Sequence, residues 1–492
     1  MKKMQLEFPW VVGERVRDLL DETSRNMFKA VITGRTDHVV YEDALFAAER
    51  GHLDVLKWIV RRTESTCLWD PDVCARAALN GHLHVIRWAV FNGCEMNHAA
   101  VANAALNGHL DVLKYAARIR CIKECLDSLT MGNAALNGHL HVLQWARDEG
   151  LFWYTSTTSA SAALNGHLGV IEWLCASGCI LDWRTSANAA MNGHLHVLEW
   201  VREWYSGFGQ RYAFDHRAAA GAATNGHLAV LRWAEDNGAL RTGEGYEKGY
   251  VFQGAAMNGH LDVLRWAHAR GLLFDPALDL CSEAASNGRL RVVEWALENG
   301  FVLGAVACEK AAGSGDLAVL KRVVGEGGRH CNRWICAKAA RSGNLEMLQW
   351  VRAQGFHWDR HAIDEAAREG HLDAVQWAVE NGCPTESLDG TLAAFDGHLV
   401  VLKWLYRNIF RDSPGWLEKV CVSAALSGHV HVIEWALESG AEWIDAIPRA
   451  AALQSRINVL DWAYRKKYPF GKDDTFFDSS SNMRTWRKKC FE

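Results

Sequence analysis

The stretch NAALNGHLHVLQWARDEG, residues 133–150, decides the fold because its core recurs along the chain. Close copies are AALNGHLHVIRWAVFNG at 77–93 and AALNGHLGVIEWLCASG at 162–178. The glycine before the histidine stands at 14 places from Gly51 to Gly428, and Ser455 replaces it in a last copy. The interval from Gly166 to Gly193 is one of the shortest between successive glycines. The two intervals that end at Gly226 and Gly259 are the longest. Fifteen units at such a period predict a solenoid of stacked repeats.

Each unit predicts two helices. The first is short and rich in alanine, as at 72–80, and ends in Asn-Gly, which favours the left-handed conformation that closes a helix. The second, as at 83–91, has apolar residues at helical spacing. A pair of short helices buries its apolar side only against neighbouring pairs. The expected fold is therefore all-α: about fifteen helix-turn-helix units in a curved superhelix, with the first helices lining the concave wall.

Three regions follow from the extent of the repeat. We expect an N-terminal helical cap at 1–40, the solenoid at 41–464, and a basic and aromatic C-terminal tail at 465–492. A cap is needed because the first unit of a stack has no neighbour to cover its apolar face.

The pattern A-A-x-x-G-H-L-x-V-[LI]-x-W-A-x-x-x-G resembles the ankyrin repeat from the end of its first helix onward. An ankyrin unit has about 33 residues and opens with T-P-L-H, which this sequence lacks. The shorter period of most units indicates that the protruding finger is trimmed. Compact, tryptophan-rich arrays of this kind resemble those of large DNA viruses and of algal or amoebal hosts. The resemblance extends over most of the chain, from Tyr41 to Tyr464, and implies an ankyrin-like solenoid that binds proteins.

Composition bears on partners and compartment. The net charge of −5 creates no field that would attract nucleic acid or an anionic membrane, so we expect neither as a partner. No run of 18 apolar residues occurs, and the N-terminus does not resemble a signal peptide. The 14 cysteines are scattered, which favours reduced structural thiols. We expect a monomer in the cytoplasm, a host cytoplasm if the chain is viral, with the nucleus as the alternative.

Repeated histidines raise the question of metal binding. Eleven of the fifteen units have the histidine, and four read His-x-His, as at His82 and His84. Residues i and i+2 of a helix do not face each other, so the two imidazoles should diverge and a metal site is not expected. We expect each repeated histidine to bond to backbone groups in its turn. No serine or cysteine stands at a fixed distance from His and Asp, and no phosphate-binding glycine loop occurs. The chain should therefore be no enzyme and carry no cofactor.

A tryptophan seven residues after the glycine marks thirteen of the fifteen units. A small residue usually follows it, as in Trp266-Ala267. An aromatic residue at a regular helical phase is typical of a core, where such rings bury ~150–250 Å² each. The tryptophans should therefore fill the stack.

Candidate binding residues lie just before the glycines and in the two longest units. In ankyrin-like units the two positions before the glycine face the concave wall. They hold an apolar column that becomes charged further on: Leu79, Leu106, Leu136, Leu164, Met191, Met257, Arg341, Arg368 and Phe395. The alternative is that these side chains pack on neighbouring first helices. Segments 205–219 and 240–254, which lengthen the two longest units, add Tyr212, Tyr246 and Tyr250.

The sequence thus predicts a non-enzymatic scaffold that binds a protein partner on its concave surface. One alternative comes from the N-terminus, where Pro9, Val12, Val16 and Phe28 resemble the start of an F-box. That resemblance implies a substrate receptor that docks on a cullin-type ubiquitin ligase. A second alternative is a structural or virion-associated component.

Overall fold

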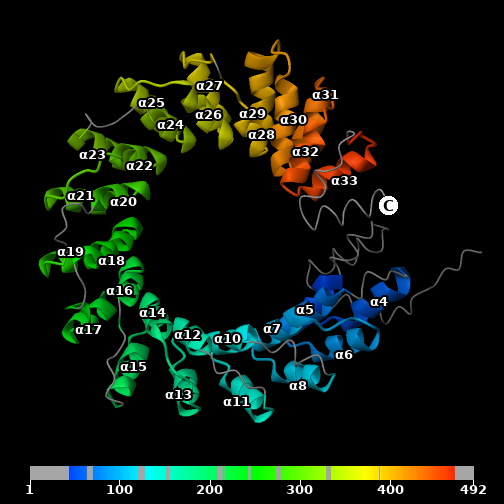
Figure 1. Ribbon diagram of the computed structural model, residues 1–492, viewed down its shortest axis with the longest axis vertical. Coiled ribbons are helices and arrows are strands. Elements are labelled where there is room, and N and C mark those ends of the chain that lie inside the picture. Colours follow the sequence, from blue (N-terminus) through cyan, green and yellow to red (C-terminus); the bar gives the residue numbers. More distant parts are fainter. Residues whose placement is uncertain are drawn as a thin grey trace, which may run out of the picture. The chain divides into compact units, whose positions relative to one another are not determined.

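The computed structural model describes residues 44–63, 70–119, 128–150, 156–207, 214, 216–241, 245–272, 279–327, 334–386 and 388–470. Every regular element in these ranges is helical, as Figure 1 shows, so the chain is a helical-repeat solenoid as predicted. None of the described helices has both the length and the apolar character that crossing a bilayer demands. The cap and F-box expectation at 1–40 and most of the tail lie outside the described residues.

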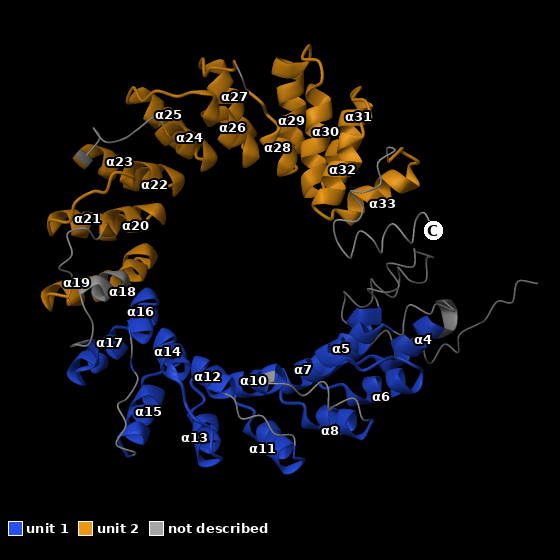
Figure 2. Cartoon of the chain, viewed as in Figure 1, with its two compact units in different colours: residues 1–243 blue, residues 244–492 orange. Residues whose placement is uncertain are grey.

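The chain divides into two compact units at Gly243 (Figure 2). In unit 1 the first helices of the repeats are α5 (Pro71–Leu79), α7 (His98–Leu106), α10 (Ser128–Leu136), α12 (Ser156–Leu164), α14 (Trp183–Met191) and α16 (His216–Thr224). The second helices are α4 (Leu53–Thr63), α6 (Leu83–Phe91), α8 (Leu110–Arg118), α11 (Leu140–Asp148), α13 (Leu168–Ala176), α15 (Leu195–Gly207) and α17 (Leu228–Asp236), followed by the 3₁₀ turn η2 (Ala239–Arg241).

Unit 2 begins at Glu244 and repeats the pattern. Its first helices are α18 (Gly245–Asn258), α20 (Leu280–Ser286), α22 (Ala307–Gly313), α24 (Trp334–Arg341), α26 (Arg360–Arg368), α28 (Leu392–Phe395), α30 (Trp416–Ser427) and α32 (Ala446–Leu453). Its second helices are α19 (Leu261–Ala269), α21 (Leu290–Glu298), α23 (Leu317–Gly327), α25 (Leu345–Ala353), α27 (Leu372–Glu380), α29 (Leu399–Leu405) with the π-helical turn η4 (Tyr406–Phe410), α31 (Val430–Glu438) and α33 (Ile457–Arg465).

The turn between the two helices of a repeat is a Schellman motif. At the end of α5, Gly81 has a φ of +70° and its N–H donates to the carbonyl of Ala78. The N–H of His82 donates to the carbonyl of Ala77 at 2.9 Å. These two bonds satisfy carbonyls that the helix end leaves open. The Asn-Gly pair therefore ends the first helix for the reason that the sequence indicated.

Within each unit the first helices form one layer and the second helices another, as the unit 1 helices in Figure 2 show. Successive first helices pack directly on one another, whereas successive second helices make far fewer contacts. The first helices can approach closely because the side chains of their paired alanines are small. Ala77 and Ala78, for example, are fully buried. The tighter layer is the concave one, so the first helices line the concave side of each unit.

The repeated tryptophans are only partly a core feature. Trp145, Trp266 and Trp295 are buried, as predicted. The other described members of the series are half-buried, as at Trp88 and Trp350. They lie on second helices, which are splayed, so one side of the indole stays accessible. The expected tryptophan core is therefore confirmed in three repeats. In the other described repeats the tryptophan is less buried than we expected.

Cysteines mostly occupy buried positions in the helices. Eight described cysteines are buried and form no disulfide, which agrees with structural thiols. Burial raises the pKa of the Cys421 thiol to about 12, so that thiol stays protonated. Cys308, by contrast, is disulfide-bonded. The expectation of reduced thiols therefore fails at that position.

Candidate binding surfaces

The repeated histidine joins each repeat to the one before it. The Nε2 of His139 lies 3.0 Å from the carbonyl oxygen of Leu106, at the end of the preceding first helix. His109 and His194 contact the corresponding carbonyls at 3.1 Å. A carbonyl only accepts, so the imidazole donates from Nε2. The sequence predicted bonds within the histidine's own turn, whereas the structure places them between repeats.

The second histidine of a His-x-His pair makes a parallel bond. The Nε2 of His141 lies 3.0 Å from the carbonyl oxygen of Gly108, the glycine of the preceding repeat. Its ring lies 5.8 Å from that of His139 at an interplanar angle of 72°. The prediction that the two rings diverge is therefore wrong, because His139 is the residue just before α11 and the spacing rule for residues inside a helix does not apply to it. Within the described ranges, no three His, Cys, Asp or Glu side chains are grouped to hold a metal ion.

The repeated asparagine completes this set of inter-repeat bonds. The Nδ2 of Asn137 donates to the carbonyl of Leu106 at 2.6 Å, and Asn165 donates to Leu136 at 2.8 Å. The terminal carbonyls of one first helix thus accept from both the asparagine and the histidine of the next repeat. We call the repeated Asn, Gly and His, in the units that have them, the turn ladder. Its Asn and His side chains bond to backbone carbonyls of the preceding repeat and so stabilise the stack.

The turn ladder predicts a dependence of stability on pH. Burial is the main cause that lowers the pKa of His82, His139, His194 and His429. Since the pKa in the unfolded chain is about 6.5, the unfolded state takes up protons at a higher pH than the folded state does. The ladder's stabilisation is therefore complete above about pH 6.5 and is lost as the pH falls below it.

We expect the urea midpoint of unfolding to be lower at about pH 5.5 than at about pH 7.5. The variant His139→Asn, which replaces a titrating group by a neutral amide, should show a smaller difference between the two pH values. Equal midpoints for the wild-type chain at both values would contradict this role of the ladder.

The apolar column is half-buried in unit 1. Leu79, Leu106, Leu136 and Leu164 are neither buried nor exposed. The more exposed members are Met191 and Phe395 at 40% and Met257 at 38%. Backbone carbonyls of the column accept inter-repeat hydrogen bonds of the turn ladder. The column therefore contributes to the stack. A binding role for the column stays a prediction.

The charged members of the column pair with the next repeat. Arg341 lies 3.0 Å from a carboxylate oxygen of Glu369, and Arg368 lies 3.4 Å from one of Asp396. These ion pairs link successive first helices in unit 2. Tyr212 and the side chains of Tyr246 and Tyr250 lie outside what the structure describes.

An exposed aromatic and basic cluster lies elsewhere, at the start of two first helices in unit 1. Trp183 is the first residue of α14 and is 39% exposed. The guanidinium of Arg217, from α16, lies 4.2 Å from the centroid of its indole ring, and that of Arg184 lies 5.7 Å away. His216, also exposed, begins α16. We call Trp183, Arg184, His216 and Arg217 the Trp183 edge.

An acidic residue, Asp182, lies beside Arg184 in this edge. The carboxylate of Asp182 accepts the backbone N–H of Arg184 and caps α14. Its other oxygen lies 3.8 Å from the Arg184 guanidinium, which is about half exposed. Such an exposed pair contributes little to stability and can exchange its partner readily. The edge therefore presents an accessible indole together with two guanidinium groups.

The residues around the Trp183 edge depart from the repeat. Arg217 lies in one of the two longest intervals, the one between Gly193 and Gly226. Tyr205 donates its hydroxyl to the carbonyl of Leu181, and Phe214 packs edge-on against Trp233. These contacts hold described residues on either side of segment 208–213 in place. Trp183 does not occupy the position that the repeated tryptophans share. This departure from the repeat is a signal in the sequence by which Trp183 could have been found.

Comparisons with known proteins return structural likenesses. No family model matches the chain, and no curated protein does. Among solved structures, the pentatricopeptide repeat protein PPR10 from maize is 14% identical over 96% of this chain and 81% of its own, with a TM-score of 0.28. PPR10 in complex with an 18-nt psaJ RNA element is 12% identical over 98% of this chain and 79% of its own, with a TM-score of 0.36.

These findings correct three expectations. The expected membership of the ankyrin family, with its viral associations, is contradicted because the matched structures are pentatricopeptide repeat proteins, a different helical-repeat family. The expected protein-binding scaffold, with its ligase-receptor and virion alternatives, is contradicted by the same matches. The expectation of no nucleic-acid partner is contradicted because two of the matched structures are complexes with RNA. A net charge describes the whole chain and says nothing of a local cluster such as the Trp183 edge.

Proposed function

We propose that the chain is a non-catalytic helical-repeat scaffold that binds single-stranded nucleic acid, with RNA as the form to test first. The observation that supports this most directly is the Trp183 edge. There a partly exposed indole lies 4.2 Å from the Arg217 guanidinium, on the first helices of two successive repeats.

This chemistry fits a single strand for two reasons. Unpaired bases stack on aromatic rings, and each such stack contributes about 1–3 kcal/mol regardless of the base. Guanidinium groups bind phosphate oxygens through paired hydrogen bonds. An indole flanked by Arg184 and Arg217 offers both kinds of contact. A repeat protein also suits a polymer, because successive repeats can contact successive nucleotides.

The net charge of −5 limits how binding depends on salt. Without a long-range positive field, the strand is held by local contacts, so few counterions are released. If Arg184 and Arg217 each neutralise one phosphate, the slope of log affinity against log salt should be about −1.4 for a single strand. A much steeper slope would indicate a basic surface other than this edge.

The test is equilibrium binding of the full chain to a fluorescent single-stranded RNA, measured by anisotropy. The variant Trp183→Ala should weaken binding by about five- to a hundredfold, the equivalent of one lost stack. Trp183→Phe should keep most of the affinity, because it keeps a ring.

Ile180→Ala is the matched control. Ile180 lies three residues before Trp183 and is 83% exposed, but it has no ring. Its replacement should leave the affinity unchanged. A wild-type chain that does not bind single-stranded RNA or DNA, or a Trp183→Ala variant that binds like wild type, would overturn the proposal.

A further inference from the structure

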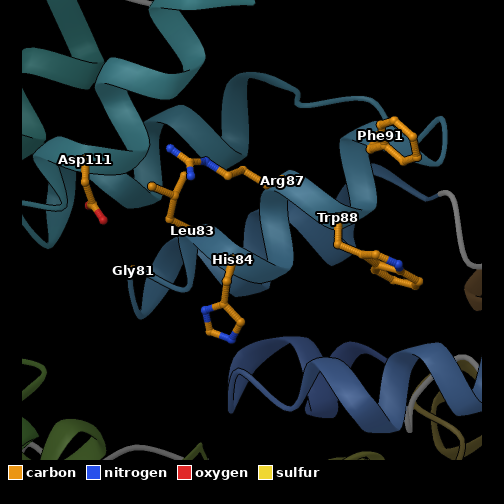
Figure 3. Close-up of a pocket in the computed structure, with 7 residues that line it drawn as sticks. All are labelled: Gly81, Leu83, His84, Arg87, Trp88, Phe91 and Asp111. Carbon is orange, nitrogen blue, oxygen red and sulfur yellow. The ribbon is translucent and has the colours of Figure 1, made fainter.

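The outer face of α6 carries an unusual set of side chains. His84, Arg87, Trp88 and Phe91 follow the spacing i, i+3, i+4 and i+7, which places them on one side of a helix. With Gly81, Leu83 and Asp111 of α8 they line a groove of about 750 Å³. Figure 3 shows Trp88 and Phe91 at one end of the groove and Gly81 at the other, with Arg87 between.

Phe91 has a side chain that the packing of the repeats does not require. Its side chain is 89% exposed, more than any other large apolar side chain described. The same place in the other second helices of unit 1 holds charged or small residues, as at Arg118, Asp148 and Ala176. An exposed phenyl ring contributes nothing to the stack, because almost none of its surface is buried.

The polar residues of the groove are held in place by neighbours. The guanidinium of Arg87 lies 5.6 Å from the ring centroid of Tyr115 in α8. The Nε2 of His84 lies 3.0 Å from the carbonyl oxygen of Gly51, and a carboxylate oxygen of Asp111 accepts the N–H of Val112. The groove thus combines an exposed ring, a half-buried indole and a positioned guanidinium.

We propose that this groove is a second nucleic-acid contact, in which an unpaired nucleobase stacks on Phe91 and an adjacent phosphate lies against Arg87. The inference rests on the proposed function and assigns a further part of the strand's path within unit 1. An exposed ring is what a base requires, since stacking uses the face of the ring, and the nearby cation matches the charge of the phosphate.

Two readouts test this contact on the full chain. In the first, RNA containing 4-thiouridine is irradiated on the protein and the adducts are mapped by mass spectrometry. An adduct is expected within α6 at Trp88 or Phe91. In the second, Phe91→Ala should weaken binding of single-stranded RNA by about five- to a hundredfold, whereas Phe91→Trp should retain it.

The matched control is Val302→Ala, which removes a side chain that is 68% exposed in unit 2 and should leave binding unchanged. Because Phe91 is so exposed, Phe91→Ala should unfold at the wild-type temperature. RNA binding that persists at full strength in Phe91→Ala, without any adduct in α6, would overturn this inference and leave the proposed function standing. A wild-type chain that binds neither RNA nor DNA would overturn both.

Discussion

Replacing Trp266 by alanine is expected to lower the free energy of unfolding by ~3–5 kcal/mol, the usual cost of deleting a buried aromatic side chain. Trp266 is 8% exposed, and its ring meets that of Phe252 edge-on at 6.5 Å. Alanine would leave a cavity between α18 and α19, which the packed helices could fill only in part. Chemical denaturation followed by circular dichroism measures the loss.

The variant Trp266→Phe separates ring volume from hydrogen bonding. Among the described residues, the indole Nε1 of Trp266 is buried without a hydrogen-bond partner. Phenylalanine removes this unpaired donor and keeps most of the ring, so it should cost far less than alanine. An alanine variant as stable as the wild type would show that Trp266 is not part of the core.

Replacing Gly108 by alanine is expected to lower the free energy of unfolding by about 2–5 kcal/mol, the sum of a backbone cost and a steric cost. Gly108 has a φ of +72°, a conformation that costs a residue with a Cβ about 1–2 kcal/mol. A Cβ there would also lie 2.6 Å from the Nδ1 of His139 in the next repeat. Because that imidazole is bonded to the Leu106 carbonyl, relieving the overlap should cost about 1–3 kcal/mol more. Urea denaturation of the variant measures the loss.

Gly150→Ala provides the matched control. Gly150 has a φ of +71°, almost the same, but a Cβ there would meet no atom within 4 Å. Both variants carry the backbone cost, so the difference between them measures the close approach of the two repeats. If the two variants lose equal stability, the contact between Gly108 and His139 does not explain why the glycine recurs.

Local features of the fold followed from the sequence because they depend on neighbouring residues. The expected second helix at 83–91 matches α6 residue for residue. The expected first helix at 72–80 is displaced by one residue, because Asp70 caps α5 and Pro71 begins it. The apolar spacing of a helix and the Asn-Gly pair that ends it each depend on residues close together in the sequence. These elements could therefore be placed without knowledge of how the repeats stack.

The role of the turn ladder could not be predicted, because its bonds join residues about one repeat apart. His141 and Gly108 are separated by 33 residues, and a periodic sequence does not show which atoms of two copies meet. The contact between Arg217 and Trp183 is of the same kind, since it joins the first helices of two successive repeats. The repeat accounts for the stack, and the candidate sites lie where the sequence departs from it.

In the proposed function, the repeated residues hold the stack while Trp183, Arg184, His216 and Arg217 contact a nucleic-acid strand. Hydrogen exchange of the full chain, measured by mass spectrometry with and without single-stranded RNA, tests it most directly. We expect RNA to slow exchange at the starts of α14 and α16 and to leave exchange in the Asn-Gly-His turns unchanged. Exchange that RNA does not alter, or alters at the turns and not at the start of α14, would contradict it.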